Sequence, residues 1–147
     1  MEKDKRLSGV DITNPEIGDV WEKVRDDNDP TNWVLLHCPN KTEINVLSTG
    51  SSGLDGLMAQ LDPSKCLYGG IRANINGMIK FYSFYCAGED VSAVQKGKNA
   101  LYKNGVLIAL TGLHGELIFP EGTQTPKEAI IAQIMKMSDA KADMIRI

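Results

Sequence analysis

The residues best suited to catalysis or metal binding are few and widely spaced in this chain. His37 and His114 are the only two histidines, and they lie too far apart for the short-spaced motifs that hold zinc. Cys38 follows His37 directly, but neighbouring residues on one strand point to opposite faces, so this imidazole could not serve as a base for the thiol. These patterns predict a protein that is not an enzyme, with no metal site and no cofactor.

The cysteine pattern bears on redox chemistry. Cys38, Cys66 and Cys86 form an odd set without a Cys-x-x-Cys pair, which favours neither a disulfide framework nor a thiolate zinc site. Each cysteine lies in an apolar, strand-like stretch, where a free cysteine commonly packs as a small buried hydrophobic residue. We therefore expect three reduced and buried thiols.

Two polar stretches could suggest ligand-binding loops, but their spacing is wrong. The stretch 48–56 is rich in Gly and Ser, yet its glycines are spaced by three and no Lys follows the second of them, as a phosphate-binding loop requires. Ser51 and Ser52 are instead expected to cap the next helix. The acidic stretch 26–29 lacks the Gly and the terminal Glu of an EF-hand loop, so we expect a solvated turn there.

Composition limits the class of protein. The 147 residues, of which 42% are hydrophobic and 24% charged, suit one globular domain with one core. A net charge of -3 and a pI near 5.4 give no general attraction to nucleic acid or to an anionic membrane. Residues 1–9 lack the apolar segment of a secretory signal, and no run of about 18 apolar residues occurs. These features favour a cytoplasmic protein without nucleic-acid or membrane partners.

Four lysines remain as candidates for a binding surface. Lys80 opens an aromatic stretch, and Lys96, Lys98 and Lys103 follow on one later segment. Charge alone would make them ordinary solvated side chains, so a binding role depends on the elements that position them.

Hydrophobic periodicity and turn signals predict these elements. Pro15 opens a helix behind the N-cap Asn14, and Asn76-Gly77 marks a tight hairpin between two long strands. The expected strands are 33–38, 43–48, 66–75, 78–87 and 116–119, and the expected helices are 15–25, 54–61, 92–103 and 126–137, with 106–110 suiting either a helix or a strand. The mixed order predicts an α+β fold, with a mixed sheet between helices and a polar, fraying tail from Ser138.

Five short motifs occur in an order that resembles the coactosin-like group of the actin-depolymerising-factor homology (ADF/cofilin) family. In chain order they are Val24-Arg25-Asp26-Asp27 before Trp33-Val34, Thr49-Gly-Ser-Ser-Gly-Leu54, Tyr68-Gly-Gly-Ile-Arg72, Lys80-Phe81 and Gly88-Glu89-Asp90-Val91-Ser92. The likeness covers the chain from Asn14 to Phe119. It implies an α+β fold whose central mixed sheet of five or six strands is flanked by helices on both faces. The whole chain, 1–147, is expected to be one such domain, with a core over about 14–137 and flexible termini.

The resemblance also implies a function and a set of contact residues. Coactosin-like proteins bind the side of actin filaments without strong severing, so filamentous actin is the expected partner of a monomeric, cytoplasmic and cytoskeletal protein. Lys80 matches the family's filament-binding lysine, and Lys96 and Lys98 match the basic pair on its long helix, with Lys103 farther along. Because actin is acidic, lysines would steer association and form charge-assisted bonds.

Two alternatives stay open within this resemblance. The chain could be a cofilin-like depolymerising or severing factor that binds monomeric actin, or an adaptor with a chaperone-like role for another cytosolic protein. Cys86 stands where the family usually has a Trp before Gly-Glu, so the packing there is expected to differ. Asn104-Gly105 is expected to interrupt the long helix and to weaken a monomer-binding surface.

Overall fold

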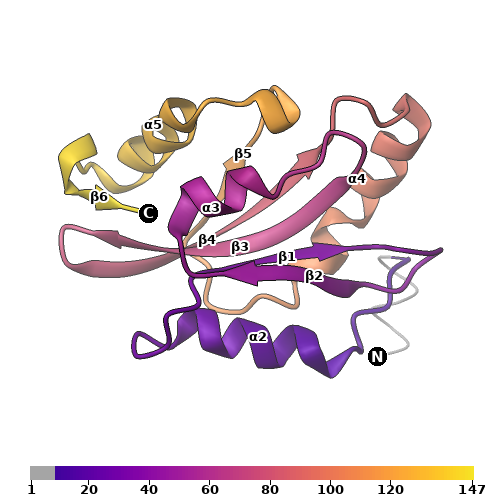
Figure 1. Ribbon diagram of the computed structural model, residues 1–147, viewed down its shortest axis with the longest axis horizontal. Helices are drawn as coiled ribbons and strands as arrows, with labels where there is room; N and C mark the ends of the chain where they lie inside the picture. The colour runs from indigo at the N-terminus through magenta and orange to yellow at the C-terminus, as the bar shows by residue number, and fades with distance from the viewer. Residues whose placement is uncertain (1–8) are drawn as a thin grey trace.

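The computed structural model describes residues 9–147, which form one mixed sheet with helices on both faces (Figure 1). The strands are β1 (Trp33–His37), β2 (Asn45–Gly50), β3 (Cys66–Ile75), β4 (Met78–Ala87), β5 (Gly115–Ile118) and β6 (Ile145–Arg146). The strand order is β2-β1-β3-β4-β5, with β6 beside β3. The β4–β5 pair is parallel and the other pairs are antiparallel, so the expected α+β fold with a mixed sheet is confirmed.

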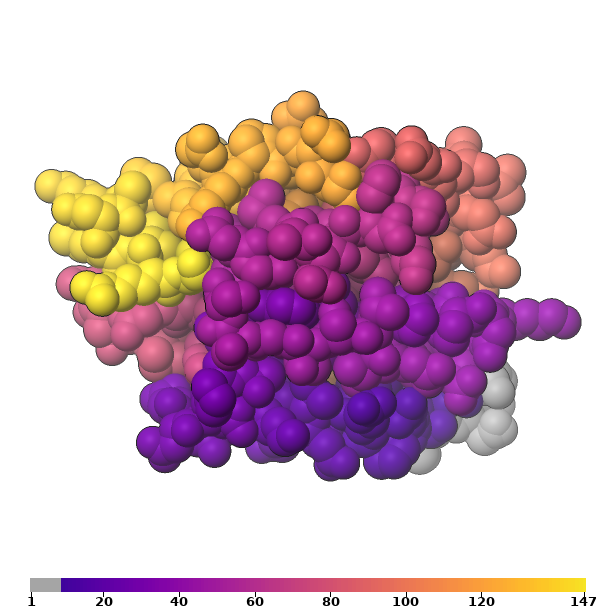
Figure 2. All heavy atoms as spheres, in the orientation of Figure 1, coloured from indigo at the N-terminus to yellow at the C-terminus, as the bar shows by residue number. Residues whose placement is uncertain are grey.

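Within residues 9–147, four α-helices cover the sheet. They are α2 (Pro15–Arg25), α3 (Gly53–Ala59), α4 (Ala93–Leu107) and α5 (Lys127–Ser138), with short 3-10 turns η1 (Gly122–Gln124) and η2 (Ala142–Met144) on either side of α5. One hydrophobic cluster joins α2 and the end of α4 to one face of the sheet. A second cluster joins α3 and α5 to the opposite face. In the space-filling view α3 lies across the middle of the molecule between α5 and the strands β1 and β2 (Figure 2).

The β3–β4 hairpin is the centre of both clusters. Its strands pair over their full length, and the turn residues Asn76 and Gly77 have positive φ values of 53° and 89°, as a tight hairpin requires. Successive β4 side chains enter opposite clusters: Phe81 packs toward α2 and α4, whereas Tyr82 and Phe84 pack toward α3 and α5. The prediction of a central strand covered on both faces is therefore confirmed.

Cys86 stands where the family usually has a Trp, and it is buried. Cys86 is only 1% exposed and lies in the α3/α5 cluster. The rings of Phe84 and Phe119 in the same cluster are 5.5 Å apart between centroids. Cys86 thus packs as a small side chain in a cluster that contains these two rings.

The amino-terminal helix α2 begins where its sequence predicts, and contacts of Trp21 hold it in place. The Asn14 side chain accepts a hydrogen bond of 2.9 Å from the Glu16 amide, which caps α2. The buried indole of Trp21 donates to the Thr111 carbonyl at 2.8 Å and packs edge-on against Phe81. These contacts fasten α2 to the sheet and to the segment between α4 and β5.

Three expected details are wrong. Strand β2 begins and ends two residues later than expected, because Thr42 and Ile44 bond to Asp11 rather than to β1. Helix α4 runs through Asn104-Gly105 without interruption. The chain after Ser138 is not a frayed tail, because it forms η2 and then β6, which pairs with β3.

The expected helix cap and the expected thiol burial also need correction. Neither Ser51 nor Ser52 caps α3 through its hydroxyl; the Asn32 side chain accepts from the Gly53 amide at 3.1 Å instead. All three cysteines are free thiols, but only Cys86 is buried, whereas Cys38 and Cys66 are half-buried. Both lie at strand ends, where cover from the helices is incomplete.

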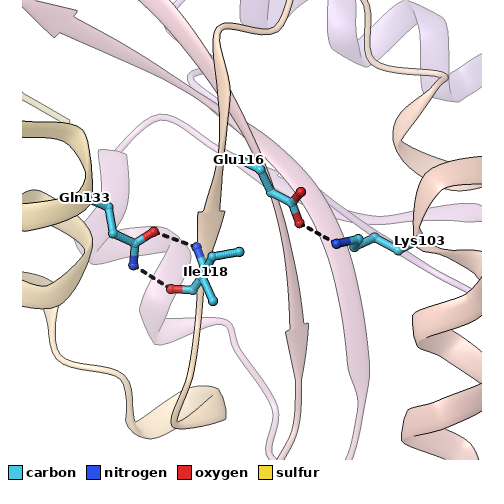
Figure 3. A network of polar contacts seen from close by, with 4 residues as sticks. All are labelled: Lys103, Glu116, Ile118 and Gln133. Carbon is cyan, nitrogen blue, oxygen red and sulfur yellow. Dashed lines mark hydrogen bonds and ion pairs between the residues drawn. The ribbon is translucent and has the colours of Figure 1, made fainter. Parts of the chain in front are cut away.

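The outer edge of β5 is closed by a side chain rather than by another strand (Figure 3). The Gln133 amide of α5 accepts from the Ile118 amide at 2.7 Å and donates to the Ile118 carbonyl at 2.8 Å. This pair of bonds copies the pattern of a neighbouring strand. It satisfies edge groups that would otherwise be open to pairing with another chain.

Glu89, in the motif that follows β4, ties that strand end to the turn before α5. Its carboxylate accepts from the Thr123 amide at 3.0 Å and from the Thr123 hydroxyl at 2.8 and 2.9 Å. The hydrogen bond from the Thr123 hydroxyl, helped by backbone amides, lowers the pKa of Glu89 to about 2. A carboxyl that is more acidic in the folded state stabilises the fold above its unfolded pKa, and this stabilisation is lost as the pH falls.

We therefore expect Glu89→Gln to flatten the acid branch of the stability curve. The wild-type protein should lose the Glu89 contribution between about pH 4.5 and pH 2, while the variant should lack this loss. Urea unfolding midpoints at a series of pH values measure the difference. Glu22→Gln, at an exposed position on α2, is the control and should keep the wild-type pH dependence. A Glu89→Gln curve parallel to the wild-type curve would contradict the assignment.

Candidate functional site

The outer side of α4 carries an unusual number of exposed apolar side chains. Val94, Leu101 and Ile108 are 79%, 81% and 60% exposed. They are spaced by seven residues, which turns each by only about 20° from the one before. Lys98 lies between the first two, at helical spacings of four and three, and shares their side of the helix. We call Val94, Lys98, Leu101 and Ile108 the α4 face and take it as a candidate interaction surface.

Tyrosine hydroxyl groups of the sheet hold the amino-terminal half of α4. The Tyr68 hydroxyl donates to the Asn99 carbonyl at 2.7 Å, and the Tyr85 hydroxyl donates to the Lys96 carbonyl at 3.3 Å. The two tyrosine rings stack with centroids 5.1 Å apart. Burial raises the pKa of both tyrosines well above the usual range, so both hydroxyls stay protonated as donors. These bonds set the direction in which the α4 face points.

The three lysines of α4 do not share one environment. Lys98 is exposed and its ammonium lies 6.0 Å from the Tyr102 ring centroid. Lys96 is half-buried and, two residues from Lys98, points to a different side. Lys103 follows Lys96 by seven residues on that same side, and its ammonium pairs with Glu116 of β5 at 2.9 Å (Figure 3).

Lys80 lies on the opposite face of the sheet from α4. It pairs across the hairpin with Ala73 and precedes the part of β4 that pairs with β5. Its neighbours Ile79 and Phe81 pack in the α2/α4 cluster, so alternation places Lys80 on the α3/α5 side with Tyr82. Between residues 9 and 147 the structure has two ion pairs, and neither involves Lys80. The predicted lysines therefore form two separate surfaces rather than one.

Ile108 is a residue of the α4 face that sequence reasoning from the lysines did not find. The signal that could have found it is the seven-residue spacing from Val94 through Leu101, which continues to Ile108 only if α4 stays helical. The expected break at Asn104-Gly105 hid this continuation.

The histidines have structural positions. His114 exchanges two hydrogen bonds with Phe81: its amide donates to the Phe81 carbonyl at 2.7 Å, and its Nδ1 accepts from the Phe81 amide at 3.0 Å. Burial, with a smaller effect of Lys65, lowers the pKa of His37. Among residues 9–147, His, Cys, Asp and Glu side chains nowhere gather in a group of three that could hold a metal ion. In the same part of the chain, every helix is too short or too polar to cross a membrane.

Comparison with known proteins finds relatives that are similar over most of this chain. The chain is 28% identical over 129 residues to drebrin-like protein of Mus musculus, covering 86% of this chain but 30% of that protein. It therefore spans less than a third of the length of that relative. It is 24% identical over 137 residues to coactosin of Dictyostelium discoideum, covering 89% of this chain and 93% of coactosin.

A solved structure shows the same fold. The solution structure of mouse coactosin superimposes with a TM-score of 0.70 at 20% identity, over 91% of this chain and 96% of coactosin. The family described as cofilin/tropomyosin-type actin-binding protein matches residues 9–136. Because this match covers most of the sequence, the chain belongs to the cofilin/tropomyosin-type actin-binding protein family.

Proposed function

We propose that this chain binds the side of actin filaments as a single monomeric domain spanning residues 1–147, in the manner of coactosin and without strong severing. Its proposed role is binding alone, in the cytoplasm and at the cytoskeleton, with no reaction catalysed. Mouse coactosin, whose fold the chain shares, is named as an actin filament binding protein. The α4 face and Lys80 are the proposed contact surfaces.

The observation that carries the proposal is the placement of these surfaces on opposite faces of the sheet. A single flat partner surface could cover the α4 face or Lys80, but not both. The side of a filament presents more than one actin subunit, so two separate surfaces of one small domain can each meet a different subunit. Apolar side chains on α4 supply area to bury, and the lysines supply charge complementarity with acidic actin.

The test of this proposal is cosedimentation of Lys80→Ala with actin filaments. We expect about tenfold weaker binding, because one charge-assisted contact of the second surface is lost, worth ~1.4 kcal/mol. Binding of the wild-type chain should also weaken as the salt concentration rises, since exposed charges are screened.

Lys103→Ala is the matched control. Its ammonium already pairs with Glu116, so we expect a change smaller than for Lys80→Ala. Lys80→Ala cosedimenting at the wild-type level would remove Lys80 from the contact surface. A wild-type chain that stays in the supernatant even at low salt would overturn the proposed function.

One observation favours a second candidate, a cofilin-like factor that binds monomeric actin. The uninterrupted α4 presents its full outer face, so the expected weakening of a monomer-binding surface at Asn104-Gly105 no longer applies. Kinetics of pyrene-actin disassembly distinguish the two functions: a filament-side binder leaves the rate near the control value, whereas a severing factor raises it.

A further inference from the structure

The register of strands β1 and β3 bears on two of the three cysteines, Cys38 just after β1 and Cys66 at the start of β3. Strands β1 and β3 are antiparallel, with Trp33 opposite Ile71 and Leu36 opposite Tyr68. Continuing this register by two residues, past the last assigned pair, places Cys38 opposite Cys66. Both side chains fall on the α2/α4 side, because residues two apart on a strand share a face. Cys38 does pack against the cluster on that side.

The expected separation suits a disulfide. Residues directly opposite each other in an antiparallel ladder have Cα atoms about 4.5 to 5.5 Å apart. The extended register therefore gives this expected separation for Cys38 and Cys66. Disulfides bridge Cα separations of about 4.4 to 6.8 Å. The backbone need not move far for the bond to form.

The two thiols are also within reach of a small oxidant. Both are half-buried and line one open depression of about 450 Å³ between the strand ends and α4. Gln95 and Asn99 of α4 form the far wall of this depression. Cys86 differs, because it is 1% exposed, and burial raises the pKa of its thiol to about 12. Reactivity should therefore be confined to the first two.

The surroundings of the two thiols differ. The Cys66 Sγ lies 3.4 Å from the Tyr85 hydroxyl oxygen. The Cys38 Sγ lies 3.2 Å from the Asn40 carbonyl, and burial raises the pKa of this thiol. Because burial makes Cys38 the weaker nucleophile, the first step is assigned to Cys66 and the second to Cys38.

We propose that Cys38 and Cys66 form an intramolecular disulfide when the folded chain meets a peroxide, while Cys86 stays reduced. The Cys66 thiolate attacks one peroxide oxygen, the O–O bond breaks, and Cys66 becomes a sulfenic acid as hydroxide leaves. The Cys38 sulfur then attacks the Cys66 sulfur, the S–O bond breaks, and the leaving hydroxide takes the Cys38 proton as water. Overall, two thiols are oxidised and one hydrogen peroxide is reduced to two water molecules.

The experiment is peroxide treatment of the native chain followed by alkylation and mass spectrometry. We expect the chain to lose about 2 Da, to stay monomeric, to keep one alkylatable thiol, and to yield a digest in which the Cys38 and Cys66 peptides are linked. A thiol reductant should restore all three sites. The Cys86→Ser variant should form the same link and keep no alkylatable thiol, whereas Cys38→Ser should leave Cys66 as a sulfenic acid or a more oxidised form.

Three alkylatable thiols after treatment, a link that includes Cys86, or a covalent dimer would each overturn the proposal. Circular dichroism of the wild-type chain before and after treatment checks that the linked species is folded, and a link seen only after unfolding would also count against it. Actin takes no part in this experiment, so its result is independent of the proposed function.

Discussion

The double variant Lys98→Glu/Leu101→Asp is expected to weaken binding to actin filaments by about a hundredfold, or ~2.7 kcal/mol. Both residues belong to the α4 face, where Leu101 is 81% exposed. The change removes an apolar contact and places two negative charges against acidic actin, and like charges brought together across an interface are costly. Because neither side chain is part of the core, the fold should be retained.

The measurement is a cosedimentation titration at low salt, with a control of equal charge. Lys41→Glu/Ala59→Asp makes the same change in net charge at two exposed positions, on the β1–β2 turn and at the end of α3. The control should bind like the wild-type chain. Equal losses in both double variants would mean that net charge, rather than the α4 face, governs binding.

The second large effect is on stability, and it concerns a glycine in the centre of the sheet. Gly69→Ala is expected to reduce the free energy of unfolding by about 3 kcal/mol. A methyl group at this position would collide with the Val34 carbonyl oxygen of β1 and would lie 2.6 Å from the Phe84 ring. A backbone oxygen in a paired strand cannot move aside, so the strands or the ring must shift. The close approach explains why β3 has a glycine directly after Tyr68.

Urea unfolding measures this loss, and the chain offers a glycine of the opposite kind as control. Gly18 lies in α2, and a methyl group there would have no neighbour within 4 Å. Ala favours a helix more than Gly does, so Gly18→Ala should raise the free energy of unfolding by up to about 1 kcal/mol. If Gly69→Ala unfolds at the wild-type urea concentration, the packing described for β3 is wrong.

Local signals in the sequence were sufficient for much of the fold. The bounds of β3 and β4 follow from Asn76-Gly77 and the apolar runs on either side, because turn residues that accept positive φ set the hairpin register. Helix α2 follows from Asn14 and Pro15 for a similarly local reason. These features depend on residues close together in the chain, where propensity and geometry act directly.

Contacts between distant segments decided the features that the sequence analysis missed. Helix α4 continues through Asn104-Gly105 because Val106 and Leu107 at its end are buried in the core. That burial outweighs the ~1 kcal/mol that Gly costs within a helix. The pairing of β1 with β3 stops at Trp33, opposite Ile71. Farther along β3, Asn74 and Ile75 have no partner in β1, and β6 pairs with them instead.

For the candidate site too, some features follow from the sequence and others only from the tertiary structure. The sequence by itself determined where Lys80, Lys96, Lys98 and Lys103 stand relative to Phe81 and to the long helix, which is a matter of order along the chain; their binding role stays a prediction from the family resemblance. Only the tertiary structure decided that Lys80 and Lys98 lie on opposite faces of the sheet and that Lys103 pairs with Glu116. The physical reason is that a side chain's face depends on strand alternation and helix rotation within the packed sheet, which are settled by burial of the two hydrophobic clusters.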